Sequence, residues 1–125
     1  MLKVKSTSIQ PDGKFKVTYK GDSITDTYAT GHFFLDASKY EDLTFNDLNK
    51  LAYTKIKEDF KNKTFNITTT NEESDGRFNI SFNAKGENSS YISGNFVIQE
   101  NTYSNTAFSQ LREMAYTKLI EDFKR

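Results

Sequence analysis

The sequence predicts an α+β protein in which a β-β-β-α unit occurs twice. Three observations support this class: an internal repeat with an offset of 63 residues, alternating apolar and polar residues in three segments of each copy, and a helical apolar pattern in the fourth. Since the chain of 125 residues has the usual size of one domain, we expect a single domain, residues 1–125, built from repeats 2–62 and 65–125. The expected architecture is one six-stranded, mostly antiparallel sheet with two helices on one face.

The repeat aligns without a gap over the whole chain. Residues 52–61 read AYTKIKEDFK, and residues 115–124 read AYTKLIEDFK. The same offset matches identical residues along both copies: Asp12-Gly13 with Asp75-Gly76, Phe15 with Phe78, Tyr28 with Tyr91, Gly31 with Gly94, Phe33 with Phe96, Tyr40 with Tyr103 and Leu48 with Leu111. Because one copy alone would bury too little surface for a stable core, we expect the two copies to share one.

The first half of each copy has the pattern of a β-hairpin followed by a third strand. LKVKS and KFKVTYK alternate apolar and polar residues around the turn QPDGK, and the second copy repeats this as FNITT, ESDGR and RFNISFN. Third strands are expected at 26–35 and 89–98. A glycine inside each of them, Gly31 and Gly94, predicts a bulge or a close approach of two backbones.

The last part of each copy has the periodicity of an amphipathic helix. The first helix is expected to begin near Thr44, where Thr44 and Asp47 have the spacing of a capping box, and to run to about residue 61; the second should cover about 106–124. The repeated AYTK..EDFK segment then packs on the sheet. Asp59 and Asp122 fall at the edge of the apolar stripe. They either pair with the lysine four residues earlier or meet as two symmetry-related carboxylates.

Composition excludes several classes of catalytic site. The chain has no cysteine and one histidine, so thiolate sites and two-histidine metal sites are excluded, and no glycine-rich phosphate loop occurs. We expect a protein that is not an enzyme, with no catalytic, cofactor or metal site. The 17 basic and 17 acidic residues balance, and no apolar run approaches the length of a membrane helix. Without cysteines or an apolar leader, a cytoplasmic protein is expected, and the many Asn, Lys and Phe residues fit a phage or low-GC bacterial source.

One surface has an unusual composition if the strand assignments hold. Residues that alternate with the core would face away from the helices, on the open face of the sheet. In the first repeat they include five lysines and several aromatic groups, whereas the same positions of the second repeat are polar and nearly uncharged. The candidate partner-binding residues are Lys3, Lys5, Lys14, Lys16, Lys20, Tyr28, His32 and Phe34.

These observations favour a small non-catalytic binding protein, an interaction module such as a phage-type inhibitor or adaptor, with another protein as its partner. The alternative is a nucleic-acid-binding protein that holds a single strand on the lysine and aromatic side chains of the open face. The balanced net charge counts against that alternative. No membrane partner is expected, and the chain would act as a monomer or a homodimer.

Overall fold

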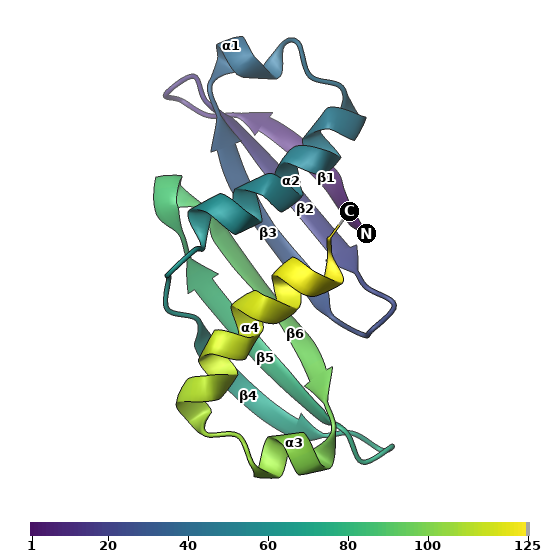
Figure 1. Ribbon diagram of the computed structural model, residues 1–125. Coiled ribbons are helices and arrows are strands. Elements are labelled where there is room, and N and C mark those ends of the chain that lie inside the picture. Colours follow the sequence, from purple (N-terminus) through teal and green to yellow (C-terminus); the bar gives the residue numbers. More distant parts are fainter. Residues whose placement is uncertain (125) are drawn as a thin grey trace.

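The computed structural model describes residues 1–124 and confirms the α+β class (Figure 1). All six strands form one antiparallel sheet in the order β1-β2-β3-β6-β5-β4. The strands are β1 (Leu2–Ile9), β2 (Phe15–Asp22), β3 (Tyr28–Leu35), β4 (Asn66–Glu72), β5 (Phe78–Lys85) and β6 (Tyr91–Ile98). The helices are α1 (Ala37–Tyr40), α2 (Phe45–Asp59), the 3-10 helix η1 (Glu87–Ser89), α3 (Glu100–Ser104) and α4 (Phe108–Asp122).

The two repeats adopt the same topology. Strands β2 and β3 and helix α2 recur as β5, β6 and α4, each beginning and ending 63 residues later. The repeats join where β3 pairs with β6, and there Thr30 lies opposite its own counterpart Ser93. The flanking pairs, Tyr28 with Asn95 and His32 with Tyr91, are also equivalent to each other. A pseudo-twofold axis therefore passes close to the Thr30–Ser93 pair.

The paired glycines permit close contact between the repeats. A Cβ atom on Gly94 would collide with the carbonyl oxygen of Tyr28, and one on Gly31 would collide with that of Tyr91. The β3–β6 register is regular, so of the two expectations for these glycines, the close backbone approach is confirmed and the bulge is wrong.

Helices α2 and α4 lie across the same face of the sheet, as expected, one over each repeat and running in opposite directions (Figure 1). Their C-terminal halves are next to each other. The hydroxyl of Tyr53 donates to the carbonyl oxygen of Ile120 at 2.8 Å, and the equivalent Tyr116 donates to that of Lys57 at 2.9 Å. Beneath the helices, Phe60 and Phe123 belong to one buried apolar cluster that draws on both repeats. The expected shared core is therefore present in the structure.

Helix α2 begins with the capping box expected from the sequence. Thr44 N donates to Asp47 Oδ2 at 3.0 Å, and Asp47 N donates to Thr44 Oγ1 at 3.1 Å. The second repeat has Ala107 in place of Thr44, so only the Gln110 half of the arrangement remains, with Ala107 N donating to Gln110 Oε1 at 2.8 Å. Both long helices end two residues before the expected positions, at Asp59 and Asp122.

Short helices that the sequence did not predict cover the two far ends of the sheet. In α1, Tyr40 stacks on Phe15 with ring centres 4.0 Å apart and donates to Thr7 Oγ1 at 3.0 Å. The equivalent Tyr103 of α3 stacks on Phe78 at 3.9 Å. These stacked pairs tie each short helix to the hairpin of its own repeat.

Both edge strands contain a β-bulge at equivalent positions, between Val4 and Ser6 in β1 and between Ile67 and Thr69 in β4. A bulge reverses the alternation of side chains beyond it, so Thr7 faces the helices. Bulges also protect exposed edges against pairing with another chain. Among residues 1–124, none of the helices has the length and apolar character needed to span a membrane.

Candidate functional site

The lysines expected on the open face occupy its two ends. Lys3 lies directly opposite Lys20 in the β1–β2 register, whereas Lys16 lies opposite Phe34 in the β2–β3 register. Since a strand rises about 3.3 Å per residue, Lys16 and Lys20 are about 13 Å apart along β2. The residues therefore form two groups on one face.

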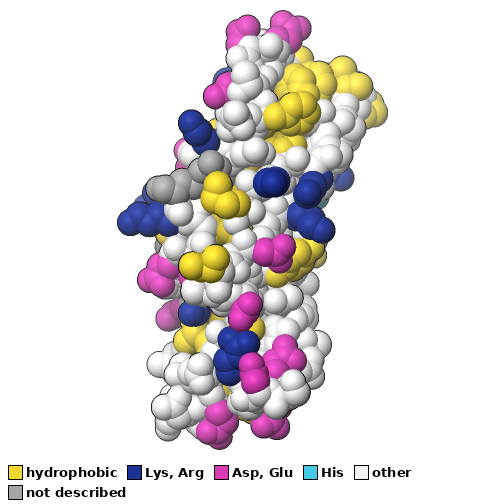
Figure 2. Space-filling view, turned by 90° about the vertical axis from the view of Figure 1, so that its right-hand side faces the viewer, with side chains coloured by type: hydrophobic (Ala, Val, Ile, Leu, Met, Phe, Trp, Pro, Cys, Tyr) yellow, Lys and Arg dark blue, Asp and Glu magenta, His cyan; other side chains and the backbone are white. Residues whose placement is uncertain are grey.

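Three lysines make up the first group, which we call the lysine triad: Lys3, Lys5 and Lys20. They line a shallow hollow of about 310 Å³ together with Met1, Gly21 and Asp22. Lys5 is the residue that the register skips, so the β1 bulge positions it beside Lys3. Of the ion pairs formed within residues 1–124, none includes a member of the triad. In Figure 2, basic side chains gather at mid-height on the side of the molecule that it shows.

Aromatic side chains form the second group, close to the junction of the repeats. His32 lies 5.5 Å from Phe34, edge to face, and 6.0 Å from Tyr91, nearly parallel, measured between ring centres. We call Phe34, His32 and Tyr91 the aromatic cluster. Lys16 lies beside it, opposite Phe34, and Lys85 lies opposite Tyr91 on the other side. The cluster is therefore flanked by a lysine from each repeat.

Strand alternation predicts Tyr91 on the open face of the second repeat as an aromatic residue of the interaction patch, whereas Lys85 is not predicted from the sequence. Both belong to the second repeat, and they join the site only because β6 pairs with β3. The repeat gives no signal for Lys85, because its counterpart in the first repeat is Asp22. Tyr28 itself lies four residues from His32 along β3, opposite Asp22 and Asn95, and takes no part in the cluster.

Burial lowers the pKa of His32, and the nearby positive charge of Lys16 lowers it further, while a backbone hydrogen bond involving Ser89 acts in the opposite direction. The imidazole is therefore more strongly neutral at pH 7 than an exposed histidine. A neutral ring can stack on a partner without adding to the charge repulsion among the lysines.

Lys14 directly precedes β2, in the turn between β1 and β2. It lines a small hollow of about 150 Å³ with Asp12, Phe34, Asn88 and Ser89. The last two residues come from the second repeat, so the predicted surface continues across the junction. The structure thus brings Lys14, Lys16, His32 and Phe34 together at one end of the first repeat and the lysine triad together at the other.

Asp59 and Asp122 of the repeated segment make contacts that differ from both arrangements expected from the sequence. Ser90 Oγ donates to Asp59, and the equivalent Thr27 Oγ1 donates to Asp122. Each carboxylate is thus bound by a hydroxyl group of the other repeat, so the expected pairing with the lysine four residues earlier is wrong, as is the idea of two carboxylates meeting each other. Tyrosine, aspartate and phenylalanine of the segment all serve the contact between repeats.

Comparisons with protein-family models, with curated proteins and with solved structures found no match to this chain. Within residues 1–124, no three histidine, aspartate or glutamate side chains are grouped so that they could hold a metal ion.

Proposed function

We propose that this protein is a non-catalytic binding protein, an adaptor or inhibitor, which recognises an acidic surface of another protein through the open face of its first repeat. The observation that carries the proposal is the Lys3–Lys20 pair. Two like charges directly opposite each other in a sheet destabilise it, and Lys5 adds a third beside them. The second repeat has Asn66, Thr68 and Asn83 at these three positions, so the fold itself does not require lysines there.

The aromatic cluster supports the same proposal. Aromatic side chains that are partly exposed beside positive charges are typical of the residues that contribute most to protein–protein affinity. The lysines would guide an acidic partner and fix its orientation, because complementary charges affect association rate and specificity more than affinity. Phe34 and Tyr91 would supply apolar contact once the partner is in place.

The test compares two variants with the wild-type protein as bait in a nuclease-treated lysate. Lys3→Glu with Lys5→Glu reverses two charges on β1, and Asn66→Glu with Thr68→Glu introduces two equivalent charges on β4. We expect the wild-type protein and the β4 variant to retain the same partner, and the β1 variant to bind it at least tenfold more weakly. Melting temperatures of all three should be similar, since the substituted side chains are exposed or half-exposed.

Equal binding by the β1 variant and the wild-type protein would place the partner site elsewhere. Equal loss by both variants would point to a general effect of negative charge and would also count against the proposal. A purified partner would then allow the affinity to be measured by calorimetry at two salt concentrations.

A second function is supported by the aromatic cluster itself. A row of stackable rings between Lys16 and Lys85 is an arrangement that single-stranded nucleic acid can occupy, with bases on the rings and phosphates on the lysines. Anisotropy of a labelled oligothymidine would test this. Binding should weaken with salt, with a log–log slope of about −0.7 for each phosphate contacted. Absence of binding at low salt would eliminate this function.

The proposal also covers the domain organisation, the location and the oligomeric state of the protein. We propose that residues 1–125 act as one domain, because β3 and β6 join the repeats in one sheet. We also propose that the protein works in the cytoplasm, as a monomer or a homodimer, without a cofactor. Sedimentation analysis of the purified chain would decide the oligomeric state.

A further inference from the structure

The two repeats contain hollows at equivalent positions. One of about 240 Å³ lies in the first repeat and one of about 580 Å³ lies in the second. All seven residues that line the first have a counterpart 63 positions away that lines the second. In the first these residues are Lys14, Phe34, Leu35, Asp36, Lys39, Lys55 and Asn88; in the second the counterparts are Arg77, Val97, Ile98, Gln99, Thr102, Lys118 and Thr25.

Each hollow is completed by a loop of the other repeat. Asn88 comes from the β5–β6 loop, which is held against α2 by the hydrogen bond from Ser90 to Asp59 and by a second bond from Asn88 Nδ2 to Asp59 Oδ1 at 3.3 Å. An ion pair between Lys63 and Glu87 holds the same loop. The protein's own contacts therefore hold the loop that completes the first hollow, and the walls of this hollow come from both repeats.

Charge distinguishes the two hollows. The first is lined by three lysines from three separate parts of the chain, with Asp36 as the one carboxylate in its lining. None of the ion pairs formed within residues 1–124 includes Lys14, Lys39 or Lys55. The hollow therefore has an excess of positive charge of about two units.

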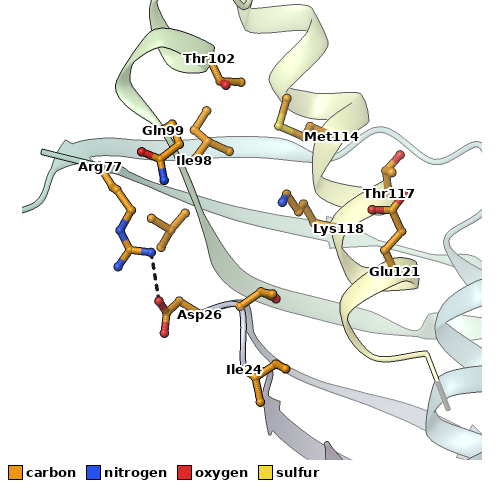
Figure 3. A pocket seen from close by; sticks show the side chains of 12 residues that line it. Ile24, Asp26, Arg77, Ile98, Gln99, Thr102, Met114, Thr117, Lys118 and Glu121 are labelled. Carbon is orange, nitrogen blue, oxygen red and sulfur yellow. Dashed lines mark hydrogen bonds and ion pairs between the residues drawn. The ribbon is translucent and has the colours of Figure 1, made fainter. Parts of the chain in front are cut away.

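The second hollow, shown in Figure 3, has no such excess of positive charge. Arg77, the counterpart of Lys14, is paired with Asp26 at 3.1 Å and with Asp75 at 2.8 Å. Thr102 replaces Lys39, and Glu121 lies in the lining together with Lys118. Val97 in place of Phe34 and Thr102 in place of Lys39 also leave more room, in agreement with the larger volume.

We propose that the first hollow is a binding site for a compact oxyanion with two negative charges, a phosphoryl group. Lysine ammonium groups bind phosphate as mobile point charges, each with three donors. A phosphate monoester has a charge of about −1.5 to −2 at pH 7, which matches the excess in the hollow. A phosphodiester within a nucleic-acid strand has one negative charge and matches it less well.

The site also extends the proposed function. Lys14 and Phe34 belong both to this hollow and to the predicted partner-binding surface. If the partner carries a phosphorylated side chain, that group would occupy the hollow while the rest of the partner covers the open face. This last step rests on the proposed function, whereas binding of the oxyanion to the hollow does not.

The experiment is an amide-resolved NMR titration of the full chain with inorganic phosphate, at pH 7.5 and with sodium chloride balancing the ionic strength. We expect saturable shifts for Asp36, Lys39, Lys55 and Asn88, and none for their counterparts Gln99, Thr102, Lys118 and Thr25. A titration with chloride alone should produce saturable shifts at neither hollow. Unsaturable shifts, or equal shifts at both hollows, would overturn the proposal.

Variants make the test independent of folding. Lys39→Thr introduces the residue found in the second hollow, and combined with Lys55→Gln it should weaken phosphate binding at least tenfold. Lys118→Gln, the matched control in the second hollow, should leave binding unchanged. Both variants should melt as the wild-type protein does, because all three lysines lie at the surface. Unchanged binding by the double variant would overturn the proposal.

A comparison of ligands identifies the source of the group. O-phosphoserine should bind more tightly than inorganic phosphate if a protein supplies the phosphoryl group, because its carbon atoms can contact Phe34. Tighter binding of inorganic phosphate would indicate the free ion. If the wild-type protein binds no phosphate, this inference is disproved. The proposed function would still stand if the variant with Lys3→Glu and Lys5→Glu loses its protein partner.

Discussion

Ser90 of the second repeat donates a hydrogen bond to Asp59 of the first, and the two residues are buried where the repeats meet. In the equivalent bond, Thr27 of the first repeat donates to Asp122 of the second. A carboxylate in such a place is costly unless hydrogen bonds satisfy it. This pair of bonds accounts for the aspartate that both copies of the repeated segment contain, because each repeat supplies the acceptor for the other.

Removal of one hydroxyl group should therefore weaken the junction. Ser90→Ala leaves Asp59 with Asn88 as its remaining side-chain partner within residues 1–124, so the free energy of unfolding should fall by about 1–3 kcal/mol. Thr27→Val should cost less, since Asp122 is only half-buried. Urea denaturation would measure both, with Ser38→Ala, a substitution at an exposed serine, as control. A stability change no larger than that of the control would show that the bond has no such role.

The first repeat expressed alone, residues 1–62, should not be a folded monomer. It would lose the β6 partner of β3 and the hydroxyl donor to Asp59. It should be unfolded, or should form a dimer in which Thr27 of each copy donates to Asp59 of the other. Light scattering after gel filtration, combined with circular dichroism, distinguishes these states. A folded monomeric half would contradict both the shared core and the single domain that we propose.

Tyr19 should tolerate loss of its hydroxyl group. The ring is buried, the hydroxyl oxygen has no hydrogen-bond partner among residues 1–124, and burial raises the pKa of the phenol far above its ordinary value, with Asp59 adding to the effect. The equivalent position in the second repeat is Phe82. Tyr19→Phe should therefore leave the free energy of unfolding unchanged or raise it by up to about 1 kcal/mol.

The reverse change provides the control for Tyr19. Phe82→Tyr introduces a buried hydroxyl group and should lower stability by about 1–3 kcal/mol. Thermal or urea unfolding of both variants would measure the difference. A clear loss of stability in Tyr19→Phe would mean that the hydroxyl group has a partner, such as a bound water molecule.

The pKa of His32 predicts a dependence of stability on pH. Burial and Lys16 lower this pKa in the folded protein, so the unfolded chain binds a proton more readily. The folded state is therefore unaffected above the ordinary histidine value of about 6.5 and loses stability as the pH falls from there through the lower folded value. Melting temperatures between pH 7.5 and 5.5 would measure the loss.

Replacement of His32 by the residue of the second repeat isolates this effect. His32→Asn introduces the side chain that the equivalent Asn95 already has, and it should reduce the fall in melting temperature over the same pH range, because no other histidine is present in the chain. An identical pH profile for the variant and the wild-type protein would show that other groups cause the dependence.

Much of the fold could be predicted from the sequence because its causes are local or repeated. The hairpin turns, the apolar alternation and the Thr44–Asp47 capping box depend on residues close in the chain. The ungapped repeat then required both halves to adopt one topology. What local patterns did not reveal were the bulge at Lys5 and the short helices α1 and α3, because these depend on how the sheet edge and its ends are covered.

The candidate site shows the same division. Strand alternation was enough to predict that Lys3, Lys16, Lys20, His32 and Phe34 lie on the open face, since it fixes the side of the sheet to which a residue belongs. Three groupings needed the folded structure: Tyr91 and Lys85 lie beside His32, Lys14, Lys39 and Lys55 line one hollow, and Ser90 donates to Asp59. These groups arise where the pairing of β3 with β6 brings together segments distant in the chain, and a local pattern contains no information about which distant residues will become neighbours.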